Sequence, residues 1–301
     1  MAIVGRFAPS PSGRMHLGNL FSALLAWLSV RRAGGTMVLR IEDLDPERCR
    51  PEYAAQLKED LLWLGLDWDV EQMPQSRKGG DYAAAFAKLE ARGLIYPCYC
   101  SRAQLHAASA PHASDGQHIY PGTCRHLTDA QRAAMTKRPA WRLIVPDADI
   151  SFTDGLQGVY TENLACDCGD FILRRADGVY AYQLAVVYDD AEAGVTQVVR
   201  GRDLLSSVPR QMYLQQLLGY KTPDYYHVPL LIAPDGRRLS KRERDLDMAR
   251  LRAAYTPGQV IGLLAQLAGL RPTAESVLPE QLVRDFSWNC VRREDVCVQF
   301  P

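Results

Sequence analysis

The sequence predicts an α/β fold built on a parallel sheet, with an irregular insertion and a helical C-terminal part. The first observation is a strand, a turn, a helix and a second strand in succession over residues 2–43, the pattern of a βαβ unit with a right-handed crossover. The second is a stretch rich in Cys, His, Ser, Ala and Pro at 97–130, and the third is a capped helix after residue 256. A chain of 301 residues, 47% of them hydrophobic, can bury a large core in two or three units.

Hydrophobic spacing defines the elements near the N-terminus. Residues 2–7 are predicted to form a short buried strand, and residues 19–32 carry apolar side chains at helical spacing up to a Gly-Gly pair. Residues 36–43 are predicted to form the second strand, and residues 51–96 to be helical. The order of these elements predicts that the two strands are parallel.

The later elements are shorter. Residues 141–200 are predicted to alternate short strands with turns, and the apolar run at 228–233, followed by an Asp-Gly turn, predicts a hairpin. A basic loop, GRRLSKRERD, leaves this hairpin at 236–245. A Thr-Pro pair opens a helix predicted to run through residue 270, because threonine caps helices and proline is tolerated at their first position.

The composition limits the class of protein. Lys and Arg number 35, as do Asp and Glu, so the formal net charge is zero and RNA contact requires a local basic patch. The chain opens with no signal peptide pattern, and its most apolar stretch is far shorter than the ~20 residues of a membrane span. We therefore expect a cytoplasmic protein, and a monomer is the simplest expectation. Unranked candidates for the basic patch are Arg125, Arg132, Lys137, Arg138 and the basic side chains between Arg237 and Arg244.

The segment RFAPSPSGRMHLGNL at 6–20 places prolines, serines and glycines between strand and helix. Such a turn presents the backbone N–H groups of a helix N-terminus to a phosphate or another anion. The segment matches neither the GxxxxGK[ST] nor the GxGxxG pattern. Taken alone, it is explained equally well as a surface turn in which His16 caps the helix or faces solvent. The basic loop at 236–245 has a similar alternative, since a lysine there can reach phosphates but exposed basic loops are usually only solvated.

Four motifs in order carry a family resemblance. They are RFAPSPSGRMHLGN at 6–19, RIEDLDPER at 40–48, YQLAVVYDD at 182–190 and VVRGRDLLSSVPRQ at 198–211. With Leu-Ser-Lys-Arg in the basic loop, they resemble the HIGH and KMSKS elements of class I aminoacyl-tRNA synthetases, and more closely the catalytic domain of glutamyl-tRNA synthetases. The resemblance implies an α/β fold with a Rossmann-like parallel sheet, a zinc-containing insertion and a helical C-terminal part, with ATP at the carboxyl ends of the strands.

The same resemblance divides the chain into four parts. They are the first half of the catalytic domain at 1–96, a zinc-binding insertion at 97–140, the second half of the catalytic domain at 141–215, and a stem-contact-like region with the KMSKS-type loop and helical tail at 216–301. About 56 residues follow the basic loop, fewer than an anticodon-binding domain of ~100 residues requires. We therefore expect no such domain.

Glutamate recognition is implied by the matched motifs. Glutamate has two carboxylates and one ammonium group, so a selective pocket requires arginines and an acid, and the motifs supply Arg6, Arg200 and Glu42. The alternatives are a surface charge for Arg6 and an ion pair with Arg40 or Arg48 for Glu42. Val186 stands where the family usually has asparagine. The implied glutamate-binding residues are Arg6, Phe7, Ala8, Pro9, Ser10, Glu42, Tyr182, which could also be a core residue, and Arg200.

The implied reaction is attack of a substrate carboxylate on the α-phosphate of ATP. Such catalysis consists mainly of positioning and charge neutralisation, with Mg²⁺ bridging phosphate oxygens. The resemblance assigns catalytic roles to His16, near the phosphates, and to Lys241, which matches the second lysine of KMSKS. The implied ATP-binding residues are His16, Gly18, Asn19, Leu239, Ser240 and Lys241.

Cysteines in the insertion predict a metal site. Cys98, Cys100 and Cys124 are soft ligands that suit one tetrahedral structural Zn²⁺. The resemblance points to Tyr120 as the fourth ligand, whereas chemistry alone favours a histidine, with His112, His118 and His126 nearby. A second pair, Cys166 and Cys168, competes for the metal, and reduced thiols without metal are the remaining alternative.

The catalytic motifs, followed by only a short helical tail, make the chain resemble glutamyl-queuosine tRNA(Asp) synthetases. These enzymes are shortened paralogues of glutamyl-tRNA synthetases. Members of that family activate L-glutamate without tRNA and attach it to the queuosine base at the wobble position of tRNA(Asp). The implied partners are L-glutamate, ATP and the anticodon stem-loop of tRNA(Asp) carrying queuosine. Two alternatives are a minimal enzyme that charges the 3′ end of tRNA(Glu) and an inactive paralogue that binds tRNA or zinc.

Overall fold

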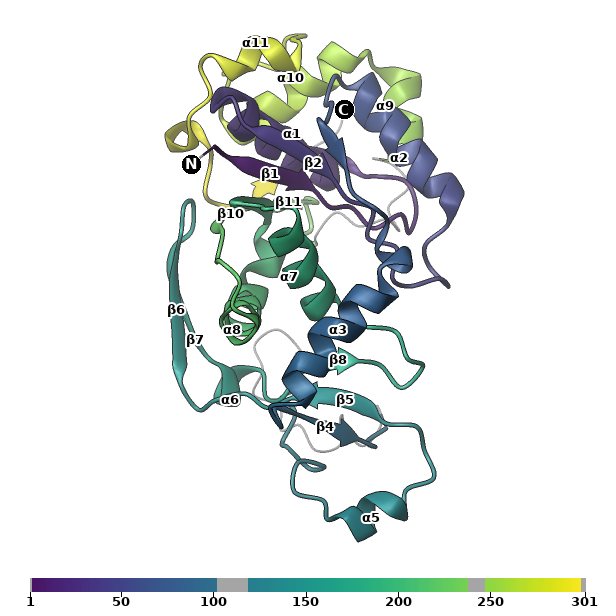
Figure 1. Ribbon diagram of the computed structural model, residues 1–301. Helices are drawn as coiled ribbons and strands as arrows, with labels where there is room; N and C mark the ends of the chain where they lie inside the picture. The colour runs from purple at the N-terminus through teal and green to yellow at the C-terminus, as the bar shows by residue number, and fades with distance from the viewer. Residues whose placement is uncertain (1, 102–118, 238–246, 299–301) are drawn as a thin grey trace.

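A computed structural model describes residues 2–101, 119–237 and 247–298. Figure 1 shows the N-terminal strands and helix packed with the C-terminal helices at one end of the molecule, and a smaller antiparallel sheet at the other end. Within the described residues, no helix is long and apolar enough to cross a membrane. Outside this part of the chain lie the sequence candidates His112, His118, Leu239, Ser240 and Lys241, together with the other basic side chains from Arg238 to Arg244.

The predicted parallel sheet is confirmed. Parallel pairs join β1 to β2, β2 to β3 and β9 to β10. The N–H of Thr196, next to β9, donates to the carbonyl of Val4 in β1 at 2.9 Å, so β1 and β9 are neighbours. The strands are β1 (Val4–Phe7), β2 (Thr36–Leu39), β3 (Val70–Glu71), β9 (Gln197–Gly201) and β10 (Asp224–Val228).

The helix α1 (Leu17–Arg32) connects β1 to β2 and is buried along most of its length. It begins two residues before the predicted start and ends at the predicted residue, where Gly34 has φ of +61°. The region predicted to be helical at 51–96 holds α2 (Pro51–Trp63) and α3 (Gly79–Glu90), but β3 lies between them. The prediction for this region is therefore correct only in part.

The second half of the chain contains an antiparallel sheet and a hairpin. Strands β4, β5 and β8 form the sheet, and β6 and β7 form the hairpin, which extends beside α8 in Figure 1. Their bounds are β4 (Ile95–Cys98), β5 (Ala140–Leu143), β6 (Asp149–Asp154), β7 (Gly158–Asn163) and β8 (Ile172–Arg174), with α5 (Asp129–Ala133) and α6 (Leu164–Asp167).

The prediction of only strands and turns over 141–200 is wrong at two places, the short helix α6 and the longer helix α7. The helix α7 (Tyr182–Glu192) lies between β8 and β9. Its sequence is rich in Tyr and Val, which favour strands locally, but packing of Leu184 and Val187 into the core stabilises the helix. Two further elements follow β9, the 3₁₀ helix η2 (Arg202–Ser207) and α8 (Val208–Leu218).

The C-terminal part is helical, as predicted. Thr256 caps α10 (Pro257–Ala268) in a capping box, and Gly269 ends it two residues before the predicted end. The Asp-Gly turn is present, since the N–H of Ala233 donates to the carbonyl of Arg237 at 2.8 Å, but β11 pairs in parallel with β12 rather than in the predicted hairpin. The remaining elements are α9 (Met248–Ala254), α11 (Pro279–Val283), β11 (Leu231–Ile232), β12 (Val296–Cys297) and the 3₁₀ helices η1 (Gln75–Arg77) and η4 (Trp288–Cys290).

Candidate active site

A cavity of about 570 Å³ lies where β1 and β9 end and α1 begins. Open α/β sheets bind ligands at the carboxyl ends of their strands, and this cavity has that position. All eleven predicted glutamate- and ATP-site residues in the described part of the chain line it. They are Arg6, Phe7, Ala8, Pro9, Ser10, His16, Gly18, Asn19, Glu42, Tyr182 and Arg200.

The N-terminus of α1 forms one wall. His16 is its N-cap: the side chain Nδ1 accepts the N–H of Gly18 at 3.1 Å, and the His16 N–H donates to the Asn19 side chain at 3.2 Å. The capping role that the sequence left open is therefore real, and the same side chain lines the cavity. A Cβ at Gly18 would lie 3.1 Å from the His16 ring, so glycine lets the imidazole fold over the helix end.

The chain returns to this wall directly after the basic loop. Asp247 forms an isolated antiparallel bridge with His16, and the N–H of Met248 donates to the carbonyl of Met15 at 3.0 Å. On the other side of the loop, Leu231 lines the cavity. Both flanks of the segment that contains Lys241 are therefore anchored at the cavity.

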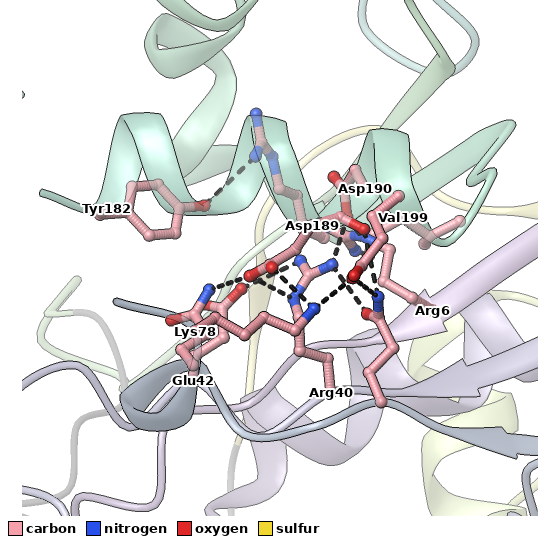
Figure 2. Close-up of polar contacts among 12 residues, drawn as sticks. Arg6, Arg40, Glu42, Lys78, Tyr182, Asp189, Asp190 and Val199 are labelled. Carbon is pink, nitrogen blue, oxygen red and sulfur yellow. Dashed lines mark hydrogen bonds and ion pairs between the residues drawn. The ribbon is translucent and has the colours of Figure 1, made fainter. Parts of the chain in front are cut away.

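A buried ion network forms the floor (Figure 2). Asp190 of α7 lies 2.6 Å from Nη1 of Arg40 and 3.4 Å from Nε of Arg6. Nη2 of Arg40 donates to Glu42 at 3.1 Å, which is one of the ion pairs the sequence left open for Glu42. Asp189 faces away from the cavity and accepts from Lys78 at 3.0 Å. The network fixes α7 against the residues that follow β2.

The pKa values of two acids in this network are shifted in opposite directions. Burial alone would raise the pKa of Asp190, but Arg40 and Arg6 together lower it below its ordinary value. Burial raises the pKa of Glu42 above its ordinary value, because Arg40 and Arg6 compensate the lost hydration only in part. Glu42 lines the cavity and lacks a full counter-charge, so a bound cation would stabilise its ionised form.

Arg200 of β9 is buried and reaches the cavity from the opposite side. Its Nη1 donates to the Tyr182 hydroxyl at 3.3 Å, and its Nη2 donates to the carbonyl of Leu204 at 3.2 Å. Tyr182 is thus a cavity residue held by Arg200, as well as part of the apolar packing of α7. The cavity is therefore lined by the cationic groups of Arg6 and Arg200 and by two acids, Glu42 and Asp203.

A second cluster lies away from this cavity. The sulfurs of Cys98, Cys100 and Cys124 all lie within 4.8 Å of one another, and they are the only such group among the described residues. The Tyr120 hydroxyl lies 3.3 Å from the sulfur of Cys98 and 3.9 Å from that of Cys100. His126 is exposed and outside the group.

Comparison with known proteins gives the family. The family model of class I tRNA synthetases (E and Q), catalytic domain, matches residues 2–289. A glutamyl-Q tRNA(Asp) synthetase of Symbiobacterium thermophilum is 50% identical to this chain, and the alignment covers 98% of this chain and 95% of that protein. The same-named protein of Nitratidesulfovibrio vulgaris is 49% identical, over 93% of this chain and 91% of that protein. The chain belongs to the glutamyl-Q tRNA(Asp) synthetase family.

A solved structure agrees with the fold of this family member. A glutamate tRNA ligase from Elizabethkingia meningosepticum, in complex with its amino acid, superposes with a TM-score of 0.84 at 25% sequence identity. The match covers 99% of this chain and 67% of that chain. The α/β catalytic fold of class I tRNA synthetases is thereby established for this chain.

In this glutamyl-Q tRNA(Asp) synthetase family member, Val186 does not line the cavity. It is 1% exposed and packs with Leu184 and Phe86 in an apolar core. The asparagine that is usual in glutamyl-tRNA synthetases is replaced here by a valine. This substitution therefore changes a contact in the apolar core and not a residue that lines the cavity.

The second cysteine pair lies outside the cluster of three. Cys166 is exposed, and the thiol of Cys168 lies 3.0 Å from the carbonyl of Gly169. Gly169 pairs with Tyr120 in an isolated bridge at φ of +67°, and a Cβ there would lie 2.4 Å from the Tyr120 carbonyl. This segment therefore supports the position of Tyr120.

Several residues at the site were not predicted from the sequence. The sequence indicates Arg40 only as a partner of Glu42, but Arg40 is fully buried and also joins two acids of α7. His227 and Asp154 also reach the site through Arg200. The motif YQLAVVYDD contained the two acids, but nothing in the spacing of residues shows which distant arginine they meet.

The candidate RNA-binding residues that the structure describes differ in their surroundings. Arg125 lies 3.8 Å from Asp170, Arg132 lies 3.6 Å from Asp129, and Lys137 and Arg138 are exposed. Arg237 pairs with Asp235, and the other basic side chains of that loop lie outside the described residues.

Proposed function

We propose that this protein activates L-glutamate with ATP, without tRNA, and transfers the glutamate to the queuosine base at the wobble position of tRNA(Asp). One observation carries the proposal: proteins named glutamyl-Q tRNA(Asp) synthetase are about half identical over nearly the whole chain. The shared cavity that holds all eleven described site residues supports it. The enzyme is then a ligase that forms an aminoacyl ester through an adenylate.

Glutamate fits the charges of the cavity. In the proposed pose, the side-chain carboxylate of glutamate meets Arg200, Tyr182 and Arg6, and its ammonium group meets Glu42. Arg200 has no carboxylate within 4 Å among the described residues, so its charge remains available to a ligand. Glutamine would leave this buried guanidinium without an anionic partner. The loss of a partner costs more binding free energy for a buried charged group than for a neutral one. The pocket would therefore select glutamate over glutamine.

ATP would bind where α1 begins. The N-terminus of α1 has a positive dipole end that suits phosphates, and His16, Gly18 and Asn19 line the cavity there. We assign Lys241, Ser240 and Leu239 to the same nucleotide because both flanks of their segment are anchored at the cavity. Mg²⁺ bound with ATP would help to neutralise the charge of the phosphates.

The chemistry proceeds in two balanced steps. A carboxylate oxygen of glutamate attacks the α-phosphorus of ATP, the bond to the bridging oxygen breaks, and pyrophosphate leaves. A hydroxyl of the queuosine cyclopentenediol then attacks the acyl carbon, its proton is lost to solvent, and AMP leaves. The residues of the cavity bind and orient the reactants in both steps, and Lys241 would stabilise charge on the departing phosphates.

We propose one structural Zn²⁺ on Cys98, Cys100, Cys124 and Tyr120. Tetrahedral Zn²⁺ with sulfur at ~2.3 Å requires sulfurs ~3.8 Å apart. The sulfurs of Cys100 and Cys124 lie 3.6 Å apart, and the Tyr120 oxygen lies within 4 Å of two of the three sulfurs. The metal would cross-link a part of the insertion that has only a small apolar cluster of its own.

The charge around this cluster supports the same conclusion. Arg142 is 6% exposed, and its guanidinium carbon lies 3.7 Å from the centre of the Tyr120 ring. No carboxylate lies within 4 Å of Arg142 among the described residues, although buried cations are normally paired. Three thiolates around Zn²⁺ would supply the missing negative charge. We therefore propose that residues 97–140 are the zinc-binding insertion.

Pyrophosphate exchange tests the first half of the proposal. We expect glutamate, and not glutamine or aspartate, to support exchange of pyrophosphate into ATP when no tRNA is present. The Arg200→Leu variant should lose this exchange while retaining its thermal unfolding midpoint within a few degrees. Exchange that required tRNA would contradict tRNA-independent activation.

A further inference from the structure

Arg200 is held at its inner end by a histidine. Arg200 and His227 are directly opposite each other in the parallel register of β9 and β10, so their side chains share one face of the sheet. Nε of Arg200 donates to Nε2 of His227 at 3.0 Å. Both residues are buried, His227 completely.

Asp154, at the end of β6, determines which nitrogen of His227 carries the proton. Its Oδ2 lies 2.6 Å from Nδ1 of His227, and both side chains are fully buried. Its Oδ1 accepts the backbone N–H groups of Leu156, Gln157 and His227. A carboxylate in this position requires N–H at Nδ1, which leaves the lone pair of Nε2 to accept from Arg200. Burial, with Arg200 adjacent, lowers the pKa of His227 below its ordinary value and so favours this neutral form.

The contacts of Arg200 leave a matched pair of donors. A guanidinium has five N–H groups. Within the described part of the chain, three are used, by His227, Tyr182 and Leu204, which leaves one N–H on each terminal nitrogen. The two oxygens of a carboxylate can accept from both terminal nitrogens of a guanidinium.

A neutral acceptor has an advantage over a carboxylate in this position. Arg6 and Arg40 both pair with Asp190, so each of them shares its charge with a carboxylate of the protein. His227 holds Arg200 without neutralising it, because the negative charge of Asp154 lies at the far side of the imidazole ring. The guanidinium is therefore fixed in direction while it keeps its attraction for an anionic ligand.

We propose that His227 and Asp154 are positioning residues for glutamate selectivity, acting through Arg200. Asp154 sets the tautomer, His227 fixes the guanidinium, and the two remaining N–H groups are directed at the side-chain carboxylate of glutamate. This inference rests on the proposed function, because it assumes that glutamate is the ligand of Arg200.

Three variants test the inference in the pyrophosphate exchange assay. His227→Leu removes the acceptor, and we expect the KM for glutamate to rise about 10- to 100-fold while the KM for ATP changes less than about twofold. His227→Gln places an amide oxygen where it can accept from Arg200, and it should restore most of the glutamate KM. Asp154→Asn keeps Oδ1 for the backbone N–H groups but donates to Nδ1, so it turns Nε2 into a donor that opposes Arg200. It should raise the glutamate KM like His227→Leu.

The control is Ser29→Ala, which removes a buried hydrogen bond to Gln197 of β9, and neither residue is among those that line the cavity. It should lower thermal stability and leave the glutamate KM unchanged. An unchanged glutamate KM in both Asp154→Asn and His227→Leu would overturn the inference, and so would equal rises in the KM for glutamate and ATP. If His227→Leu does not fold, Asp154→Asn against His227→Gln gives the same comparison. Absence of glutamate-dependent exchange in the unmodified protein would instead refute the proposed function.

Discussion

Asp190 offers a direct test of the buried ion network. The Asp190→Asn substitution keeps the shape of the side chain and removes its charge. Arg40 would keep Glu42 and Asp189 as partners, but of its partners among the described residues Arg6 would keep only the carbonyl of Val199. Removing one partner of a buried pair costs about 3–5 kcal/mol, because the remaining charge is left without compensation. At about 2–4 °C per kcal/mol, the thermal unfolding midpoint should fall by about 6–20 °C.

A matched control separates burial from distance. Arg175 and Asp177 also form an ion pair, with an N–O distance of 2.6 Å that equals the distance between Arg40 and Asp190. The side chain of Asp177 is 47% exposed, whereas that of Asp190 is 9% exposed. An exposed pair contributes about 0–1 kcal/mol, so Asp177→Asn should change the midpoint by no more than a few degrees.

The assay is thermal unfolding by circular dichroism at several pH values. The folded state lowers the pKa of Asp190 below 3.8, so its contribution is present above that value and is lost as the pH falls through the folded pKa. The gap between the original protein and Asp190→Asn should therefore be large at neutral pH and shrink below about pH 4. Equal midpoint shifts for the two substitutions at neutral pH would refute this account of the network.

Three further predictions concern the substrate and metal sites. Glutamate affinity should fall as the pH drops through the pKa of Glu42, because the ammonium group of glutamate binds the ionised acid. Burial raises this pKa above 4.5. Calorimetric titrations that give the same affinity from pH 7 to 4.5 would exclude this role for Glu42. Gly169→Ala forces a Cβ against the Tyr120 carbonyl, so it should reduce the zinc content measured by elemental analysis, whereas Gly158→Ala, at a similar φ with open space around it, should not. In the zinc-loaded protein, a thiol reagent should modify exposed Cys166, Cys290 and Cys297 before the three clustered cysteines, and a chelator should abolish this difference; equal rates before chelation would argue against metal ligation.

Local sequence predicted the elements whose stabilising contacts are local. The Thr-Pro pair capped α10, and Gly34 ended α1 at the predicted residue. These signals depend on backbone hydrogen bonds within a few residues, which a short motif determines. The error at α7 has the opposite origin, because tertiary packing there overrides the local strand preference of Tyr and Val.

The site divides in the same way. The residues that line the cavity were predicted because they belong to ordered motifs, and the structure brings all the described ones together. The residues that hold them were not predicted, since Arg200 contacts His227 and His227 contacts Asp154, and the three lie on three separate strands. Such pairings are determined by strand register and chain crossing, which the spacing of residues within one segment does not reveal.

The most direct test of the proposed function asks where the glutamate is attached. The protein would be incubated with ATP and radiolabelled glutamate, together with an isolated tRNA(Asp) anticodon stem-loop bearing either queuosine or guanine at the wobble position, or with whole tRNA(Glu). We expect alkali-labile label on the queuosine stem-loop alone, because the acceptor hydroxyl belongs to the cyclopentenediol. Label on tRNA(Glu), with the queuosine stem-loop unlabelled, would contradict the account.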